Sequence, residues 1–265
     1  MVDLHSHILP CIDDGARSEE ETISMGRIAM EEGITHIMAT PHYFGEGRDK
    51  EKAIILEKVE LVNKLFQQEG INVEVLPGNE AYLSLELPDK LKNGDVLTLN
   101  NGPYILVEFP MNNTSLYIDE ILYEIRLQGY YPIIAHPERY RQVVEDPNIV
   151  CKWIEQGNYI QVNAMSILGK HGEVVQDTAE ILMTHNMVHF IGTDAHSPRS
   201  RAPRINRAFE MVNQWVGPEL VAKLQANNLA VLKGHEVQLG EAIEYEEQIS
   251  FLKSFSIKNL FKLGS

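Results

Sequence analysis

Short apolar runs alternate along the chain with longer segments in which apolar residues recur every three or four positions. The runs are typical of buried β-strands, and the longer segments are typical of amphipathic helices. We predict strands at Val2–Ile8, Thr35–Thr40, Val73–Leu76, Tyr104–Phe109, Tyr131–Ala135, Tyr159–Val162 and Val188–Gly192. We predict helices at Glu19–Glu32, Asp49–Gln68, Tyr117–Gln128, Pro147–Gln156 and Val174–His185. This alternation indicates an α/β fold with a parallel sheet covered on both faces.

No linker rich in proline, glycine or serine divides the chain, so we predict a single domain over residues 1–250, with a helical region after about residue 203. Residues 251–265, FLKSFSIKNLFKLGS, contain lysines and no acidic residue. We expect this basic segment to be a solvated, flexible terminus. The alternative is a peripheral contact of the segment with anionic lipid or an acidic partner.

Composition narrows the class of protein. A chain of 265 residues is long enough for one α/β barrel or one large α/β domain. Its net charge of −15 disfavours nucleic-acid binding, because phosphate backbones call for a basic face. Its 2 cysteines cannot form a secreted disulfide framework, and no run reaches the roughly 18 apolar residues of a membrane span. We therefore expect a cytoplasmic protein without a transmembrane segment.

Side chains that bind metals gather where the predicted strands end. The carboxyl ends of parallel strands meet at one edge of a sheet, where α/β folds bind their ligands. His5 and His7 are two residues apart, so both point to the same face of the first strand. The whole candidate set is His5, His7, Asp14, His42, Glu80, Glu108, His136, Asp194 and His196. These side chains are too many for one ion, and they predict a cluster of two or three metals.

The ligand types indicate the metal and the reaction. Imidazole and carboxylate together suit Mn, Fe or Zn, whereas oxygen ligands alone would suit Mg or Ca. Metal clusters of this kind hold the attacking and leaving oxygens during displacement at phosphorus. Arg139 and Arg201 follow two of the ligand motifs, and a guanidinium group matches phosphate oxygens bidentately. We predict that both arginines bind the substrate phosphate, with Arg199 and Arg204 as competitors for the role of Arg201.

Seven ordered motifs carry a resemblance to a known family: DLHSHILP, IDDGA, ATPH, PGNE, VEFP, AHPERY and GTDAHS. They resemble the polymerase-and-histidinol-phosphatase (PHP) family, and within it the manganese-dependent bacterial protein-tyrosine phosphatases of capsule and exopolysaccharide loci. The resemblance runs from about residue 2 to residue 201 and implies a distorted TIM-like (β/α)7 barrel. It also implies a trinuclear site at the C-terminal mouth of the strands, with Mn²⁺ expected and Fe, Zn or Mg as alternatives.

The resemblance further implies how the metals are shared. His5, His7, Glu80 and Asp194 would hold one ion. Glu80 would bridge to a second ion held by Glu108 and His136, and a third would be held by Asp14, His42 and His196. Asp14 is chosen because the family's acid directly precedes glycine, which leaves Asp13 as a residue that supports a ligand. Glu138 is predicted to orient His136 or Arg139.

The implied activity is hydrolysis of phosphotyrosine by a metal-bridging hydroxide. The implied substrate is an autophosphorylated bacterial tyrosine kinase, attacked at the tyrosine cluster in its tail. The first alternative is a small-molecule phosphatase of the histidinol-phosphatase type, which would use the same ligands. The second is a metal-stabilised domain that only binds the kinase tail, and rim arginines and open metal positions would then be unnecessary.

Two other features have competing interpretations. Cys11 to Ser18 match C-x5-R-S, the bare pattern of cysteine-dependent tyrosine phosphatases. Asp13 and Asp14 inside this loop would repel both phosphate and thiolate, so we interpret the match as coincidence. His171 lies near glycines in a predicted loop, and we expect it to be solvated.

Overall fold

The computed structural model describes residues 1–45, 52–111 and 117–246. The strands in this part of the chain are β1 (Val2–Ser6), β2 (His36–Ala39), β3 (His42–Tyr43), β4 (Glu74–Pro77), β5 (Glu80–Tyr82), β6 (Tyr104–Glu108), β7 (Tyr131–Ala135), β8 (Tyr159–Asn163) and β9 (Phe190–Gly192). The α-helices are α1 (Glu19–Glu31), α2 (Lys52–Gln68), α3 (Leu87–Asn93), α4 (Ile118–Leu127), α5 (Arg141–Glu145), α6 (Ile149–Glu155), α7 (Ala164–Ile167), α8 (Glu173–Thr184), α9 (Asn206–Trp215) and α10 (Pro218–Leu232). Two short 3-10 helices, η1 (Leu99–Asn101) and η2 (Pro137–Arg139), complete the elements.

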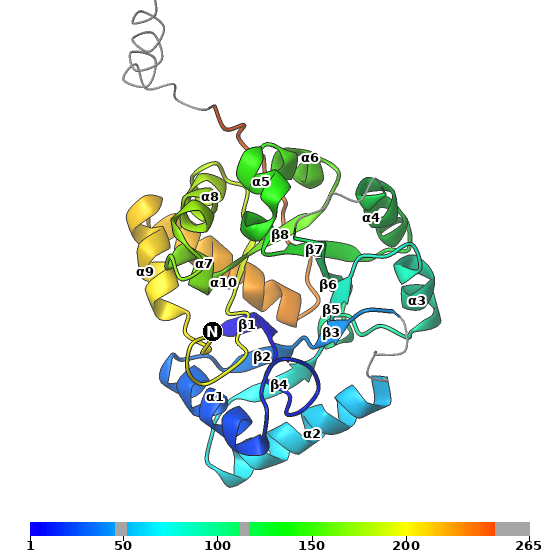
Figure 1. Cartoon of the computed structure of the whole chain (residues 1–265), viewed down its shortest axis with the longest axis vertical. Helices are drawn as coiled ribbons and strands as arrows, with labels where there is room; N and C mark the ends of the chain where they lie inside the picture. Colours follow the sequence, from blue (N-terminus) through cyan, green and yellow to red (C-terminus); the bar gives the residue numbers. More distant parts are fainter. Residues whose placement is uncertain (46–51, 112–116, 247–265) are drawn as a thin grey trace, which may run out of the picture.

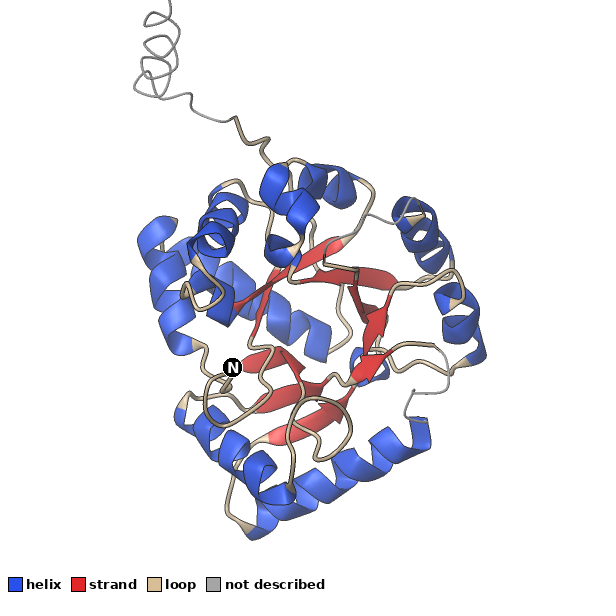
Figure 2. Cartoon of the chain, in the orientation of Figure 1, coloured by secondary structure: helices blue, strands red, loops and turns tan. Residues whose placement is uncertain are grey.

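All named strand pairs are parallel, as the sequence predicted. One sheet has the order β1-β2-β4, and the other has the order β3-β5-β6-β7-β8-β9. A single parallel bridge between Ser6 and Ala195 links the end of β1 to the segment after β9. The strands lie in the interior of the molecule, and most helices lie around them on the outside (Figures 1 and 2).

The seven predicted strands are all present, and β3 and β5 are two that the sequence did not predict. They follow β2 and β4 after breaks at Thr40-Pro41 and Gly78-Asn79. Both are too short to produce a periodic pattern, since β3 has 2 residues and β5 has 3. They matter for function because His42 and Glu80 are their first residues.

The predicted helices also form, and their ends within the described residues differ from the prediction by at most two residues. The predicted start of the helix Asp49–Gln68 lies outside the described residues. α1 begins after Ser18, whose hydroxyl accepts a hydrogen bond from the backbone N–H of Glu21 at 3.3 Å. α1 and α2 pack closely at Gly26, where an added Cβ would lie 2.4 Å from the Phe66 ring. α3, α5 and α7 have 7, 5 and 4 residues and were not predicted, because so few turns give no clear helical periodicity.

Two expectations concern the ends of the chain and membranes. The helical region after residue 203 is present as α9 and α10, and α10 packs against β1 and β9. The basic segment 251–265 lies outside the described residues. Within the described ranges, none of the helices combines the length and the apolar character that a bilayer crossing requires.

Candidate metal centre

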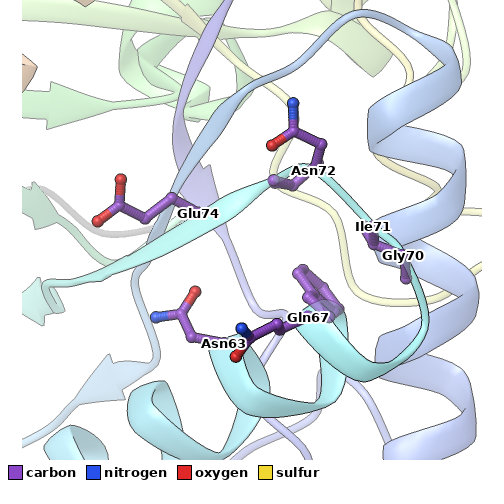
Figure 3. A pocket seen from close by; sticks show the side chains of 8 residues that line it. Asn63, Gln67, Gly70, Ile71, Asn72 and Glu74 are labelled. Atoms are coloured by element: carbon purple, nitrogen blue, oxygen red, sulfur yellow. The ribbon is translucent and has the colours of Figure 1, made fainter.

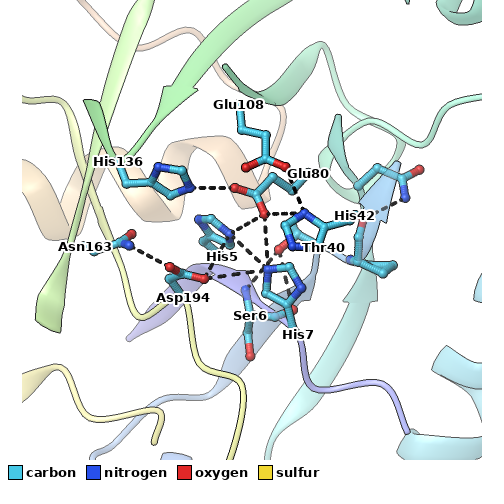
Figure 4. Close-up of polar contacts among 12 residues, drawn as sticks. His5, Ser6, His7, Thr40, His42, Glu80, Glu108, His136, Asn163 and Asp194 are labelled. Carbon is cyan, nitrogen blue, oxygen red and sulfur yellow. Dashed lines mark hydrogen bonds and ion pairs between the residues drawn. The ribbon is translucent and has the colours of Figure 1, made fainter. Parts of the chain in front are cut away.

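All nine predicted ligands lie together at one edge of the strands. Figure 4 labels seven of them, all except Asp14 and His196. His5 is in β1, and His7 follows it. Glu108 ends β6, while His136 directly follows β7. Asp194 and His196 follow β9, Asp14 comes from the loop after β1, and His42 and Glu80 begin β3 and β5. The sheet thus brings residues that are up to 191 positions apart in the sequence into one cluster.

The ligand atoms form four overlapping groups, in each of which all atoms lie within 4.8 Å of one another. The groups are His7/Asp14/His42/His196, His5/His7/Glu80, His5/His136/Asp194 and His42/Glu80/Glu108. The predicted set Asp14, His42 and His196 falls within the first group. The other two predicted sets are divided differently, and which residues share an ion remains a prediction.

Glu80 lies at the centre of the cluster. One of its oxygens, Oε2, lies 3.2 Å from Nε2 of His5, 3.2 Å from Nε2 of His7 and 3.1 Å from Nδ1 of His42. Its other oxygen, Oε1, lies 2.8 Å from Nε2 of His136. A carboxylate that faces four imidazoles is well placed to bridge metal ions bound between its oxygens and those rings.

The electrostatics of the cluster fit metal binding. Burial alone would lower the pKa of His7, but hydrogen bonds to Asp13 and Glu80 raise it to about 10. Burial alone would raise the pKa of Glu80, but the charge of His5 and a hydrogen bond from His136 hold it well below its usual range. Without metal, therefore, buried carboxylates stay charged only because imidazoles hold protons beside them. Divalent cations that replace these protons would neutralise the carboxylates. The imidazoles would then be neutral, as metal ligands must be.

Two buried nitrogens of the cluster lack hydrogen-bond partners. Nδ1 of His42 and Nδ1 of His136 are both buried, and neither has a hydrogen-bond partner of acceptable geometry among the described residues. Buried polar groups without a partner are rare in proteins and mark sites where a ligand completes the set. Nδ1 of His42 lies 3.0 Å from Oε1 of Glu108 and faces the carboxylates of the cluster.

The backbone is strained at two candidate ligands. His136 has φ 37° and Asp194 has φ 51°, both in the left-handed region that side chains with a Cβ disfavour. Such conformations concentrate at functional sites, where surrounding structure holds them. Gly15 serves the site differently, because an added Cβ would lie 2.1 Å from the carbonyl oxygen of His7.

Asp13 contacts two of the candidate ligands, and its role in supporting them remains a prediction from the resemblance. Its Oδ2 lies 2.7 Å from Nδ1 of His7 and accepts the backbone N–H of His42 at 3.2 Å. Its Oδ1 accepts the N–H of Gly15 at 2.9 Å. One carboxylate thus fixes the ring of His7 and ties the loop after β1 to the start of β3.

A chain of amides on β8 supports the cluster and was missed by the sequence analysis. Nδ2 of Asn163 donates to Oδ2 of Asp194 at 2.7 Å, and Oδ1 of Asn163 accepts from Nε2 of Gln161 at 2.9 Å. Oε1 of Gln161 lies 2.9 Å from Nδ1 of His5. Because the Asp194 carboxylate can only accept, each amide has one possible orientation, and the proton of His5 is placed on Nδ1. Nε2 of His5 is then free to bind a metal.

The sequence contains a signal for the amides of Gln161 and Asn163. Gln161 and Asn163 are polar residues two apart in an otherwise apolar strand, which places both on one face. Both are fully buried. Period-2 spacing of buried amides at a strand end could have marked them as residues that orient ligands.

Two arginines reach the cluster from its rim. Nη1 of Arg139 donates to Oδ2 of Asp194 at 3.2 Å, and Nη2 of Arg201 lies 2.7 Å from the same oxygen. Arg199 and Arg204 instead pair with Glu21 and Glu32, at 3.9 and 3.4 Å. Among these four arginines, Arg139 and Arg201 are the ones that pair with a candidate ligand.

Glu138 and His171 are both at least partly removed from solvent. Glu138 is fully buried, and its Oε1 accepts the backbone N–H of Asn163 at 3.0 Å, which ties it to β8. Its role in orienting His136 or Arg139 remains a prediction. His171 is half-buried rather than solvated, with Nδ1 3.0 Å from Oγ of Ser166. Burial and the charge of Arg139 lower its pKa to about 4.

The C-x5-R-S pattern does not form a phosphate cradle. Sγ of Cys11 is exposed and donates to the carbonyl oxygen of Arg17 at 3.0 Å. The N–H of Cys11 points to the carbonyl of Ala16, at 2.8 Å. A thiolate nucleophile needs N–H groups directed at sulfur, and here a carbonyl oxygen faces it instead.

The sequence matches the family described as capsular polysaccharide synthesis, CpsB/CapC, over residues 1–233. The chain belongs to this family. It is 34% identical over 237 residues to the tyrosine-protein phosphatase YwqE of Bacillus subtilis, covering 89% of this chain and 93% of that protein. It is 29% identical over 244 residues to the tyrosine-protein phosphatase CpsB of Streptococcus agalactiae, covering 89% of this chain and all of that one.

The fold of the family agrees with this assignment. A solved chain from the work on YwqE of B. subtilis and CpsB of Streptococcus pneumoniae, described as unique metal-dependent tyrosine phosphatases, superposes with a TM-score of 0.90. It has 33% sequence identity, and the match covers 93% of this chain and 100% of that one. The resemblance predicted from the seven motifs is therefore confirmed, and the chain is an enzyme of the CpsB/CapC family.

Proposed function

We propose that this protein hydrolyses phosphotyrosine in a protein substrate with the help of divalent metal ions. The observation that carries the proposal is the convergence of five imidazoles and four carboxylates beneath two arginines that share Asp194. We propose His5, His7, Asp14, His42, Glu80, Glu108, His136, Asp194 and His196 as the metal ligands, with Mn²⁺ as the preferred ion. The mixed donor set supports Mn, Fe or Zn over Ca.

The role of the chain's own residues follows from their positions. When bound, the metal ions supply a hydroxide at neutral pH and neutralise charge on the phosphate oxygens. Arg139 and Arg201 are held by Asp194 and hold the phosphate above the ligands, so that phosphorus is presented in one orientation. Both guanidinium groups also stabilise the charge that develops on phosphate in the transition state. A phenolate leaving group, with a pKa of about 10, departs without a dedicated acid.

An aromatic rim beside the cluster supports phosphotyrosine over the alternative, histidinol phosphate. The Phe44 ring lies 5.2 Å from the His42 ring and 5.7 Å from the Tyr82 ring. Phe44 is 47% exposed, whereas its neighbour Tyr43 is buried in the core. Phe44, exposed, and Tyr82, half-buried, offer a stacking surface for a phenyl ring next to the ligands.

We also infer that the two sheets form one distorted (β/α)7 barrel. Taking β2 with β3 and β4 with β5 gives seven strands in order, and the bridge from Ser6 to Ala195 joins the first to the last. A cytoplasmic location and a bacterial tyrosine kinase of the capsule system, autophosphorylated on its tail, complete the proposal. The family's description supports the link to capsule synthesis, and the relatives' names support tyrosine phosphatase activity. The location, the kinase and its tail come from the resemblance and the composition of the sequence.

The test is phosphate release from a phosphotyrosine peptide by wild type, Cys11→Ser and His136→Ala, each metal-stripped and again with Mn²⁺. We expect Cys11→Ser to keep its activity, His136→Ala to lose it, and stripped wild type to recover only with metal. Activity that survives stripping and depends on Cys11 would overturn the proposal. Comparing the phosphotyrosine peptide with histidinol phosphate as substrate separates the protein phosphatase from the small-molecule phosphatase. We expect the variant Phe44→Ala to raise KM for the peptide about tenfold.

A further inference from the structure

Two hollows lie on either side of the loop that carries Arg201. The first, of about 270 Å³, is lined by the candidate ligands Asp14 and His196 together with Arg17. The second, of about 620 Å³, lies between α7, the following loop and the start of α9. Arg199, Ser200 and Arg201 line both hollows. A molecule bound in the first hollow therefore needs to cross only this loop to enter the second.

The residues that line the second hollow are mostly basic, whereas the protein as a whole is acidic. Its lining contains five cationic residues, Lys170, Arg199, Arg201, Arg204 and Arg207, and one acid, Glu32. The chain as a whole has 38 acidic and 23 basic residues. Glu32 is already engaged, because its carboxylate pairs with Arg204 at 3.4 Å and accepts the backbone N–H of Asn206 at 2.9 Å. Arg199, Arg201 and Arg204 are paired with acidic residues. The excess positive charge of the hollow therefore comes from Lys170 and Arg207.

The walls and the rim of this hollow differ in character. Met165, Leu168 and Ala202 provide apolar surface. Lys170 and Arg207 are exposed, and within the described ranges neither forms an ion pair. Arg139 and Arg201, by contrast, are fixed by Asp194. Fixed guanidinium forks suit a phosphate, whereas freely hydrated cations above apolar walls suit the methylene groups and terminal carboxylate of an acidic side chain.

Another hollow of similar size provides a contrast. It lies between the end of α2 and the start of β4, with a volume of about 580 Å³ (Figure 3). Its polar lining consists of amides and Glu74, and it contains no cation. The amide of Asn63 is occupied by both backbone groups of Val75, at 2.8 Å each. This hollow offers nothing that would select an anionic ligand.

We propose that the hollow lined by Lys170, Arg204 and Arg207 binds an acidic side chain of the protein substrate, adjacent to the phosphotyrosine held at the metal centre. This inference rests on the proposed function and adds to it the sequence preference of the enzyme. Neighbouring residues of an extended peptide are about 3.3–3.6 Å apart along the chain, so a residue close to the phosphotyrosine can reach across the shared loop. Selectivity then comes from charge complementarity that lowers KM and leaves the chemical step unchanged.

The test compares phosphotyrosine peptides that carry glutamate, or the neutral and isosteric glutamine, before or after the phosphotyrosine. For wild type at low salt we expect KM to be about fivefold lower for one of the glutamate peptides than for its glutamine match, with equal kcat. The variant Lys170→Glu/Arg207→Glu is expected to lose this preference. The control Lys64→Glu/Lys92→Glu makes the same change of net charge on α2 and α3, across the molecule from α7 and α9 (Figure 1), and is expected to keep it.

Several results would overturn the inference: no preference in wild type, a preference that survives Lys170→Glu/Arg207→Glu, or an equal loss in the control. A stronger preference for a second phosphotyrosine than for glutamate would assign the hollow to phosphate and refute the carboxylate. Hydrolysis of free phosphotyrosine tests the proposed function separately from the binding of an acidic side chain. If free phosphotyrosine is not hydrolysed, only the proposed function is refuted. Fluorescence anisotropy then measures directly whether a labelled, phosphate-free glutamate peptide binds more tightly than its glutamine match.

Discussion

Gln161→Leu tests whether the amide chain on β8 prepares His5 for a metal. The substitution keeps the volume of the side chain but removes the oxygen 2.9 Å from Nδ1 of His5 and the N–H that bonds Asn163 at 2.9 Å. Two buried polar groups lose their partners, at roughly 1–3 kcal/mol each, so the metal-free protein should lose about 3 kcal/mol of stability. The proton of His5 is no longer held on Nδ1, so metal affinity should fall about 10- to 100-fold.

Asn228→Leu is the matched control. Asn228 is also a buried amide, but its Nδ2 donates at 2.9 Å to the carbonyl oxygens of Val2 and Ile191 and contacts no candidate ligand. Its loss should destabilise the protein by a similar amount while leaving metal affinity near that of wild type. Urea unfolding in a chelator measures the stability, and calorimetric titration with Mn²⁺ measures the affinity. Equal Mn²⁺ affinities for Gln161→Leu and Asn228→Leu would refute the role assigned to the amide chain.

Three further predictions follow from the structure. Burial lowers the pKa of His189 from 6.5 to about 4, so the unfolded chain binds the proton first and the free energy of unfolding falls as the pH drops below about 6.5. In urea unfolding, the stability difference between wild type and His189→Asn should shrink by about 2 kcal/mol between pH 7 and pH 5. A constant difference would contradict this prediction. In Gly15→Ala the new Cβ would meet the carbonyl of His7, so activity should fall at least tenfold, on the order of 1.4 kcal/mol, with unchanged circular dichroism. Chelation should lower the free energy of unfolding by about 3 kcal/mol, and Mn²⁺ at roughly 100 times its Kd should restore it; an unchanged melting temperature would argue against a bound metal.

The sequence predicted those parts of the fold that repeat over several residues. β6 and β7 are apolar on nearly every residue because both faces of the sheet are covered, and such runs stand out in the sequence. β4 was the least distinct of the predicted strands, and Glu74 in it is indeed exposed. β3 and β5 escaped prediction because strands of 2 and 3 residues form only where neighbouring strands supply their partners.

The candidate ligands were predictable for a reason that does not extend to the residues around them. A histidine or carboxylate at the end of a buried strand conflicts with its apolar setting, and the gathering of several such residues at one edge of the sheet is what predicts metal ions. Gln161 and Asn163 are neutral, and each could be satisfied by a backbone group, so neither stands out. The residues of the basic hollow are less visible still. Lys170 and Arg207 are ordinary exposed cations in sequence, and only the fold places them beside one another and across one loop from Asp14 and His196. Sequence can therefore point to the chemistry of a site, whereas substrate selectivity depends on surfaces that exist only once the loops are folded.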